Sequence, residues 1–308
     1  MVSPAFASVI GQAQAVTLLS QAIDRDRIAP AYLFAGVAGV GRSLTARCFA
    51  AKLLGGSDRR ILEGNHPDLL WVEPTYLHQG KRISAAEAAE MNLKRKAAPQ
   101  IRLEQIREIS LFLSRPPLES KRSIVVIEQA ETMAEPAANG LLKTLEEPGR
   151  ATIILIALSV EALLPTLVSR CQVIPFTRLS QDAIAQILQR NGQTELLQLP
   201  EVMALAQGSV SSAIEANAQL QLIPAELQKE LLQPPQSARQ ALELARQVAQ
   251  LELETQLWLI DYLQQHYWQQ TGQSKLLEAL ETARRSLQAF AQARLVWEVT
   301  LLAINLAA

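Results

Sequence analysis

A glycine-rich stretch near the start of the chain has residue types and a spacing that could bind phosphate. Gly36 and Gly41 stand five positions apart, with Gly39 between them and with Arg42 and Ser43 following. The pattern matches the phosphate loop Gly-x4-Gly-Lys-[Ser/Thr] except at the lysine. In such loops backbone N–H groups surround an anion at a helix N-terminus, and the serine hydroxyl binds magnesium. A planar guanidinium needs different room from a compact ammonium group, so we expect weak residual binding and no efficient hydrolysis. A glycine turn without a ligand is the alternative.

A second position of the same chemistry is also altered. The apolar run Ile124–Ile127 is followed by Glu128 and Gln129. In phosphate-loop enzymes this strand ends in an aspartate and a second acidic residue, which hold magnesium and orient the nucleophile. The amide of Gln129 cannot accept a proton as a carboxylate does. Two altered positions predict a lost activity; the alternative is a self-sufficient ATPase that tolerates Arg42 and uses Glu128 for magnesium.

The elements around these residues predict an α/β fold. Tyr32–Ala35 reads as a strand before the glycine loop, and Leu44–Leu54 as a helix after it. Continuous apolar runs of this kind are typical of strands buried on both faces, and helical patterns lie between them. This alternation favours a parallel sheet with flanking helices. Beyond about Thr177 the spacing is helical throughout. The further apolar runs are Leu69–Val72, Ile124–Ile127, Thr152–Ile156 and Val173–Phe176.

Two stretches interrupt this pattern. Residues 76–100 are polar and match neither period well, so we expect an inserted, mobile loop; its cations are Lys81, Arg82, Lys94, Arg95 and Lys96. These cations could contact nucleic acid, or they could be a solvated surface insertion. Near residue 234, two consecutive prolines predict a break between helices and a domain boundary within 222–236.

Composition limits the classes of function. The formal net charge of the 308-residue chain is -1, which gives no basis for tight, solitary binding to nucleic acid. Cys48 and Cys171 are too few for a disulfide framework or a four-cysteine zinc site, and no metal site is expected. The longest apolar stretch, near Ala151–Val160, is shorter than the roughly 20 residues of a membrane helix, and the N-terminus lacks a signal-peptide pattern. We expect a cytoplasmic protein.

Several longer motifs together resemble a known family. They are Ala-Ala-Asn-Gly-Leu-Leu-Lys-Thr-Leu-Glu-Glu-Pro at 137–148, Leu-Pro-Thr-Leu-Val-Ser-Arg-Cys at 164–171, Asn-His-Pro-Asp at 65–68 and Arg-Leu-Val-Trp-Glu at 294–298. These strings resemble the bacterial clamp-loader subunits of the AAA+ class. The resemblance implies three domains: an AAA+ nucleotide-binding-like domain at 1–176, a small helical lid at 177–225 and a helical collar at 226–308.

The resemblance also implies a role for the Ser169-Arg170-Cys171 motif. In the family its arginine is an arginine finger, placed in the ATP site of a neighbouring subunit, where a guanidinium offsets charge on the transferred phosphate. Alternatively Arg170 is an ordinary surface arginine, and Cys171 is most simply a packed core residue. Ser211 stands where the family's motors carry a sensor arginine. A kept finger and an altered own site resemble the delta-prime group, and the alternative is a gamma/tau-like motor.

Membership in the clamp-loader family would imply particular partners and cofactors. It implies a hetero-pentameric ring with gamma/tau and delta subunits, which loads the sliding clamp onto primed DNA as part of the DNA polymerase III holoenzyme, with no membrane partner. The chain itself would catalyse nothing and require no cofactor, while weak ATP or ADP binding stays open. No zinc is expected, because residues 53–60 replace the four-cysteine module of many relatives. A standalone DNA-binding module is a third reading.

Overall fold

The computed structural model describes residues 6–55, 59–62, 64–91 and 98–307. The chain divides into two compact units. The first comprises Met1–Thr194 and Gln207–Ser211, and the second comprises Glu195–Ala206 and Ser212–Ala308. The division into three domains at residues 176 and 225 stays a prediction.

A five-stranded parallel sheet forms the centre of the first unit. Its spatial order is β2-β5-β6-β1-β7, so the strand before the glycine loop lies inside the sheet. Because the strands are parallel, their carboxyl ends meet at one edge, and the residues that follow them become neighbours. The strands are β1 (Ala31–Ala35), β2 (Leu69–Val72), β5 (Ser123–Ile127), β6 (Ala151–Ala157) and β7 (Gln172–Pro175).

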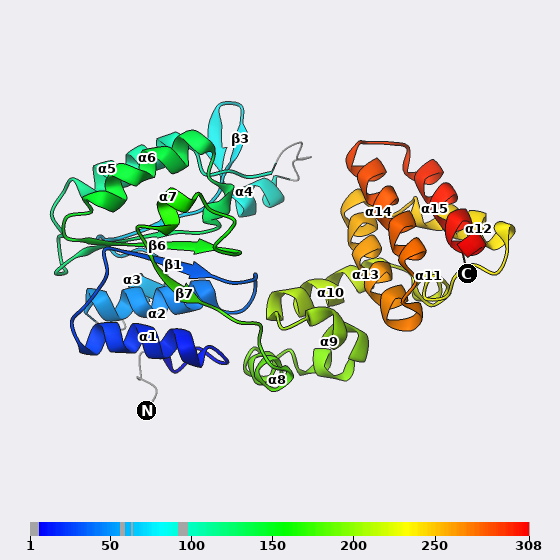
Figure 1. Ribbon diagram of the computed structural model, residues 1–308, viewed down its shortest axis with the longest axis horizontal. Helices are drawn as coiled ribbons and strands as arrows, with labels where there is room; N and C mark the ends of the chain where they lie inside the picture. Colours follow the sequence, from blue (N-terminus) through cyan, green and yellow to red (C-terminus); the bar gives the residue numbers. More distant parts are fainter. Residues whose placement is uncertain (1–5, 56–58, 63, 92–97, 308) are drawn as a thin grey trace. The chain divides into compact units, whose positions relative to one another are not determined.

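Helices cover both faces of this sheet, as Figure 1 shows, with α1, α2 and α3 on one face and α5, α6 and α7 on the other. The two faces of β1 divide between them. Tyr32 packs edge-on against Phe49 of α2 with ring centroids 5.2 Å apart, whereas Leu33 belongs to the core under α5 and α6. All five β1 residues are buried, as the continuous apolar run predicted. The helices are α1 (Ala13–Asp24), α2 (Arg42–Leu54), α3 (Arg59–Leu62), α4 (Ala85–Glu90), α5 (Leu103–Leu113), α6 (Glu135–Glu146), α7 (Pro165–Val168) and α8 (Gln181–Arg190), with short 3-10 turns at Ala130–Thr132 and Thr194–Gln198.

The segment 76–100, expected to be an inserted loop, contains regular structure in its first part. Strands β3 (Tyr76–His78) and β4 (Lys81–Ile83) form an antiparallel hairpin, and α4 follows it. Gln79 and Gly80 both have positive φ, at 49° and 78°, which is the two-residue turn that matches the twist of a hairpin. Strands of three residues are too short to show a period of two. Residues 94–96, with three of the cations, lie outside the described residues, as do residues 56–58 of the expected zinc-module replacement.

The Asn-His-Pro-Asp motif holds the loop that leads into β5. The carboxylate of Asp68 accepts hydrogen bonds from the backbone N–H groups of Leu118, Glu119 and Ser120 at 2.6, 2.9 and 2.7 Å. Burial alone would raise the pKa of Asp68, but these three donors outweigh it and hold the pKa below its ordinary value. The ring nitrogen Nδ1 of His66 accepts from the Asp68 N–H at 3.1 Å. The motif therefore fixes the backbone of residues 118–120 in this chain.

The regular elements in the described part of the second unit are all helices, as the sequence predicted. Its core centres on the fully buried Trp297, whose indole N–H donates to Gln256 at 2.8 Å. Tyr267 is also fully buried and donates its hydroxyl to the Leu231 carbonyl at 2.7 Å. The helices from the end of the first unit onward are α9 (Pro200–Ala206), α10 (Val210–Leu222), α11 (Ala225–Leu231), α12 (Ala238–Val248), α13 (Leu253–Thr271), α14 (Ser274–Gln288) and α15 (Ala293–Ala307).

No helix among the described residues combines the length and the apolar character that a bilayer crossing requires.

Candidate functional site

The glycine loop joins β1 to α2 at the carboxyl edge of the sheet, where the sequence placed it. Gly41 has φ of 98° and caps the N-terminus of α2, a conformation that favours glycine. The loop carbonyls are held by the surrounding chain: Val40 accepts from the Gln12 side chain at 3.1 Å, and Gly39 accepts from the Val210 N–H at 3.2 Å. These bonds join the loop to Gln12 and to the segment at Val210.

Arg42 turns its guanidinium into the protein. It is 8% exposed, and its Nη1 donates to the carbonyl of Ala157, the last residue of β6. Burial lowers the pKa of Arg42, while the carboxylates of Glu131 and Glu128 oppose that shift. One carboxylate oxygen of Glu131 is itself buried and has no hydrogen-bond partner among the described residues. The arginine is therefore engaged with the strand ends of its own domain.

Glu128 and Ser43 come together, although they are 85 positions apart. The Ser43 hydroxyl donates to the Glu128 carboxylate, as it must because an ionised carboxylate only accepts. Burial raises the pKa of Glu128; the Ser43 hydrogen bond opposes the rise, and the nearby Glu73 carboxylate adds to it. Gln129, by contrast, is exposed and has φ of 47° at the start of a 3-10 turn. The two residues of the altered second motif thus do not act as a pair.

The segment after α9 packs directly on the glycine loop. A Cβ atom placed on Gly39 would meet the Ser209 hydroxyl at 2.4 Å and Ser211 Cβ at 2.7 Å, so no larger residue fits there. Ser211, which stands at the expected position of a sensor arginine, therefore lies against the loop itself. Residues 207–211 belong to the same compact unit as the loop.

Arg170 lies away from these residues, between α7 and β7. Its side chain is 36% exposed, and it pairs with Glu146 at the end of α6, with Nη2 and the carboxylate 2.6 Å apart. Ser169 donates to the Thr166 carbonyl at 3.1 Å and lies 3.4 Å from Arg170 Nη1. Burial raises the pKa of Cys171 to about 11, so its thiol stays protonated and is a poor nucleophile.

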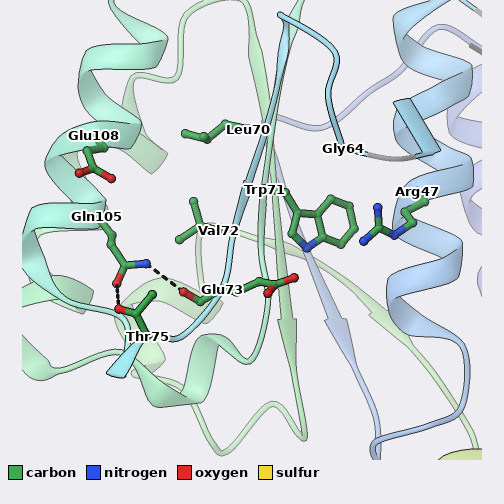
Figure 2. Close-up of a pocket in the computed structure, with 9 residues that line it drawn as sticks. All are labelled: Arg47, Gly64, Leu70, Trp71, Val72, Glu73, Thr75, Gln105 and Glu108. Atoms are coloured by element: carbon green, nitrogen blue, oxygen red, sulfur yellow. Dashed lines mark hydrogen bonds between the residues drawn. The ribbon is translucent and has the colours of Figure 1, made fainter. Parts of the chain in front are cut away.

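A cavity of about 360 Å³ lies along β2, the strand at one edge of the sheet (Figure 2). On one side the Arg47 guanidinium lies 4.2 Å from the centre of the Trp71 ring. On the other, Gln105 donates to the Glu73 carbonyl at 2.9 Å and accepts from the Thr75 hydroxyl at 3.2 Å. The Trp71 indole N–H has no acceptor within the described part of the chain. Sequence reasoning did not anticipate this cavity.

Two further carboxylates of the site were also missed. Glu73 follows β2 just as Glu128 follows β5, so the rule that parallel strands end at one edge could have paired them. Glu131 lies three residues beyond Glu128, and its position near the buried Arg42 follows only from the fold. The structure therefore assembles one cluster around Arg42 and a separate, outward-facing motif around Arg170.

These features define a class of protein. A glycine loop after the first strand, and a parallel sheet in which that strand lies between the fourth and the fifth main strands, are the AAA+ form of the phosphate-loop domain. Residues 11–180 match the family model described as DNA polymerase III, delta subunit. Residues 182–304 match the model described as cyanobacterial DNA polymerase III delta prime, C-terminal domain. The chain belongs to the DNA polymerase III delta and delta-prime subunit family, which confirms the resemblance.

Individual relatives agree with this assignment. The delta′ subunit of DNA polymerase III from Bacillus subtilis is 36% identical over 186 residues, which cover 56% of this chain and 50% of the relative. The delta′ subunit from Pseudomonas aeruginosa is 35% identical over 167 residues, 50% of this chain and 45% of the relative. The matched region thus spans about half the length of these curated relatives. A crystal structure of a gamma subunit-related protein from Thermotoga maritima covers 95% of this chain and 98% of its own with a TM-score of 0.52; at 18% identity it shows a shared fold.

Proposed function

We propose that this chain is the delta-prime-type subunit of a clamp loader. In this proposal it joins gamma/tau and delta subunits in a hetero-pentameric ring, helps load the sliding clamp onto primed DNA, and offers Arg170 to the ATP site of a neighbouring motor. Its own phosphate loop hydrolyses nothing. The observation that carries the proposal is the division of its arginines: Arg42 is buried in its own domain, and Arg170 lies at the surface in an intact Ser-Arg-Cys motif.

The geometry around Arg42 argues against an active magnesium–ATP site in this chain. The residue at the lysine position is bonded to the Ala157 carbonyl. A hydrolysing site needs the cation at this position on the phosphates of the nucleotide. Gly39 is covered by Ser209 and Ser211, and the position of the sensor arginine holds no cation. These residues do not fit the magnesium-bound ATP that the fold family implies.

An apolar stripe on α15 supports the assembly part of the proposal. Leu295, Val299 and Leu306 recur at helical spacing on one face of this helix, and Val299 and Leu306 are 61% and 87% exposed. Solitary exposed apolar residues are ordinary, but a row along one helix is typical of an interaction surface. Because α15 lies in the region predicted as the collar, we assign this stripe to neighbouring collar helices of the ring.

A second exposed apolar site supports contact with the sliding clamp. The side chain of Leu118 is 78% exposed, while its backbone N–H donates to Asp68, so the backbone that carries this side chain is ordered. Leu111, near the end of α5, is exposed as well. An ordered backbone loses little conformational entropy on docking, and exposed leucines favour a partner with an apolar pocket.

The proposal is tested in the assembled ring. We expect Arg170→Ala to lower turnover at the served ATP site by about 10³-fold or more, as loss of an arginine finger does, while assembly measured by size-exclusion chromatography stays intact. Arg150→Ala is the matched control, because Arg150 is exposed and lies outside the motif. Normal ATPase activity in the Arg170→Ala ring would refute the role of this residue.

One observation favours the runner-up, a self-sufficient ATPase. Ser43 and Glu128 lie in contact, and a hydroxyl beside a carboxylate is the pair that could share a magnesium ion. The isolated chain decides between the two: we expect no ATP turnover and weak or no binding of labelled ATP or ADP. Steady turnover by the purified chain would favour the motor.

A further inference from the structure

The guanidinium of Arg170 is almost fully engaged within its own chain. Its Nε and Nη2 both donate to one carboxylate oxygen of Glu146, at 3.0 and 2.6 Å. Its Nη1 donates to the Thr166 carbonyl at 2.9 Å and lies 3.4 Å from the Ser169 hydroxyl. A guanidinium has five N–H donors, so about four of them already have acceptors. An arginine in this state has few N–H donors left to bind a second anion.

The position of Glu146 strengthens this attachment. Glu146 is the last residue of α6, and Glu147 caps the same helix end. A helix C-terminus carries a partial negative charge, so two carboxylates there repel it and each other. Arg170 is paired with Glu146 and therefore offsets part of this local negative charge. The resting place of the guanidinium is therefore set by electrostatics, in addition to the two contacts within its own loop.

The same edge of the guanidinium would be needed by a phosphate. Arginine recognises phosphate most strongly through two parallel N–H groups, and Glu146 occupies the Nε and Nη2 pair. We propose that Glu146 is a positioning residue that holds Arg170 withdrawn on its own chain, so that the phosphate of a nucleotide on the neighbouring subunit must displace this carboxylate. The inference rests on the proposed function. Both side chains are partly exposed, so water can assist the exchange and the restraint is modest.

The test compares ATP turnover of assembled rings in the absence of clamp and DNA. Glu146→Gln keeps the shape of the side chain and removes its charge, so we expect turnover at the served site to rise about 1.5- to 5-fold, the range that an exposed ion pair supports. Glu147→Gln makes the same charge change one residue away, and Glu146→Asp keeps the charge. We expect both controls to remain near the unmodified ring.

Two readouts separate this role from a structural role in α6. In rings that carry Arg170→Ala, adding Glu146→Gln should change nothing further, because the effect of one residue is exerted through the other. The rise should also shrink as salt is added, since screening weakens the ion pair in the unmodified chain. A structural defect of α6 would persist without Arg170 and at every salt concentration.

The outcomes distinguish this inference from the proposed function. Unchanged or reduced turnover in the Glu146→Gln ring overturns the inference, provided that Arg170→Ala alone abolishes turnover at the served site. If Arg170→Ala alone leaves turnover normal, the arginine-finger proposal itself has failed.

Discussion

Replacing Gln12 by alanine should release the glycine loop from its supports. Gln12 is 4% exposed and lies just before α1. Its amide nitrogen donates to the carbonyls of Val40 and Thr177 at 3.1 and 2.7 Å, and its amide oxygen accepts from the Thr177 N–H at 3.1 Å. One side chain thus joins the start of α1, the glycine loop and the segment that leaves β7.

The cost follows from these three bonds. An intramolecular hydrogen bond contributes about 1 kcal/mol, and a buried group left without a partner costs at least as much. Gln12→Ala should therefore destabilise the first unit by about 3 kcal/mol. For a unit of this size that lowers Tm by about 6–12 °C.

Calorimetry of the full chain measures this shift as the unfolding transition of the first unit. Gln21→Ala is the matched control, because Gln21 is an exposed residue of α1, and its Tm should move by no more than about 1–2 °C. Equal shifts for the two variants would show that the three bonds contribute nothing beyond the loss of a glutamine, and the reasoning from their geometry would be wrong.

Two further predictions concern the altered motif and the collar. The pKa of Glu128 is raised above its ordinary 4.5, so the folded chain binds more protons than the unfolded chain and loses stability as pH rises from about 4.5 through the raised value. The Tm of Glu128→Gln minus the Tm of the unmodified chain should consequently be larger at pH 7 than at pH 4. An equal difference at the two pH values would contradict the predicted direction. Val299→Asp should leave Tm of the isolated chain nearly unchanged, because Val299 is exposed, but should weaken ring assembly in size-exclusion chromatography with the partner subunits. Leu242→Asp, on the exposed part of α12, is the control that should still assemble.

The fold was predictable where buried strands are continuous in apolar character. The run at Leu69–Val72 has the bounds that the structure gives, and the others differ by a residue or so at each end. The hairpin of β3 and β4 was not predictable, because each strand has three residues and its turn is made by Gln79, an uncommon residue at positive φ. A strand can be predicted from its pattern of apolar residues only when it is long enough for that pattern to repeat.

The sequence predicted which residues belong to the site, but it did not predict which groups their side chains contact. Sequence identified Arg42 as unusual, but its acceptor, Ala157, lies 115 positions away and is reached only through the register of β1 and β6. Likewise, Glu146 and Arg170 belong to two separate motifs that sequence recognised, and nothing in either motif showed that they form an ion pair. Contacts across the fold depend on helix placement, which periodicity does not specify.

The contact between Gly39 and residues 209–211 has a thermodynamic consequence. A ligand shifts a conformational equilibrium only by the difference in its affinity for the two states. Here the loop and the segment beside it are joined by the Val210–Gly39 hydrogen bond and by serine packing, all supplied by the chain itself. These contacts stabilise the state in which the loop and the segment are joined. A nucleotide could separate the loop from residues 209–211 only if it bound the separated state more tightly, by more than the free energy of these contacts.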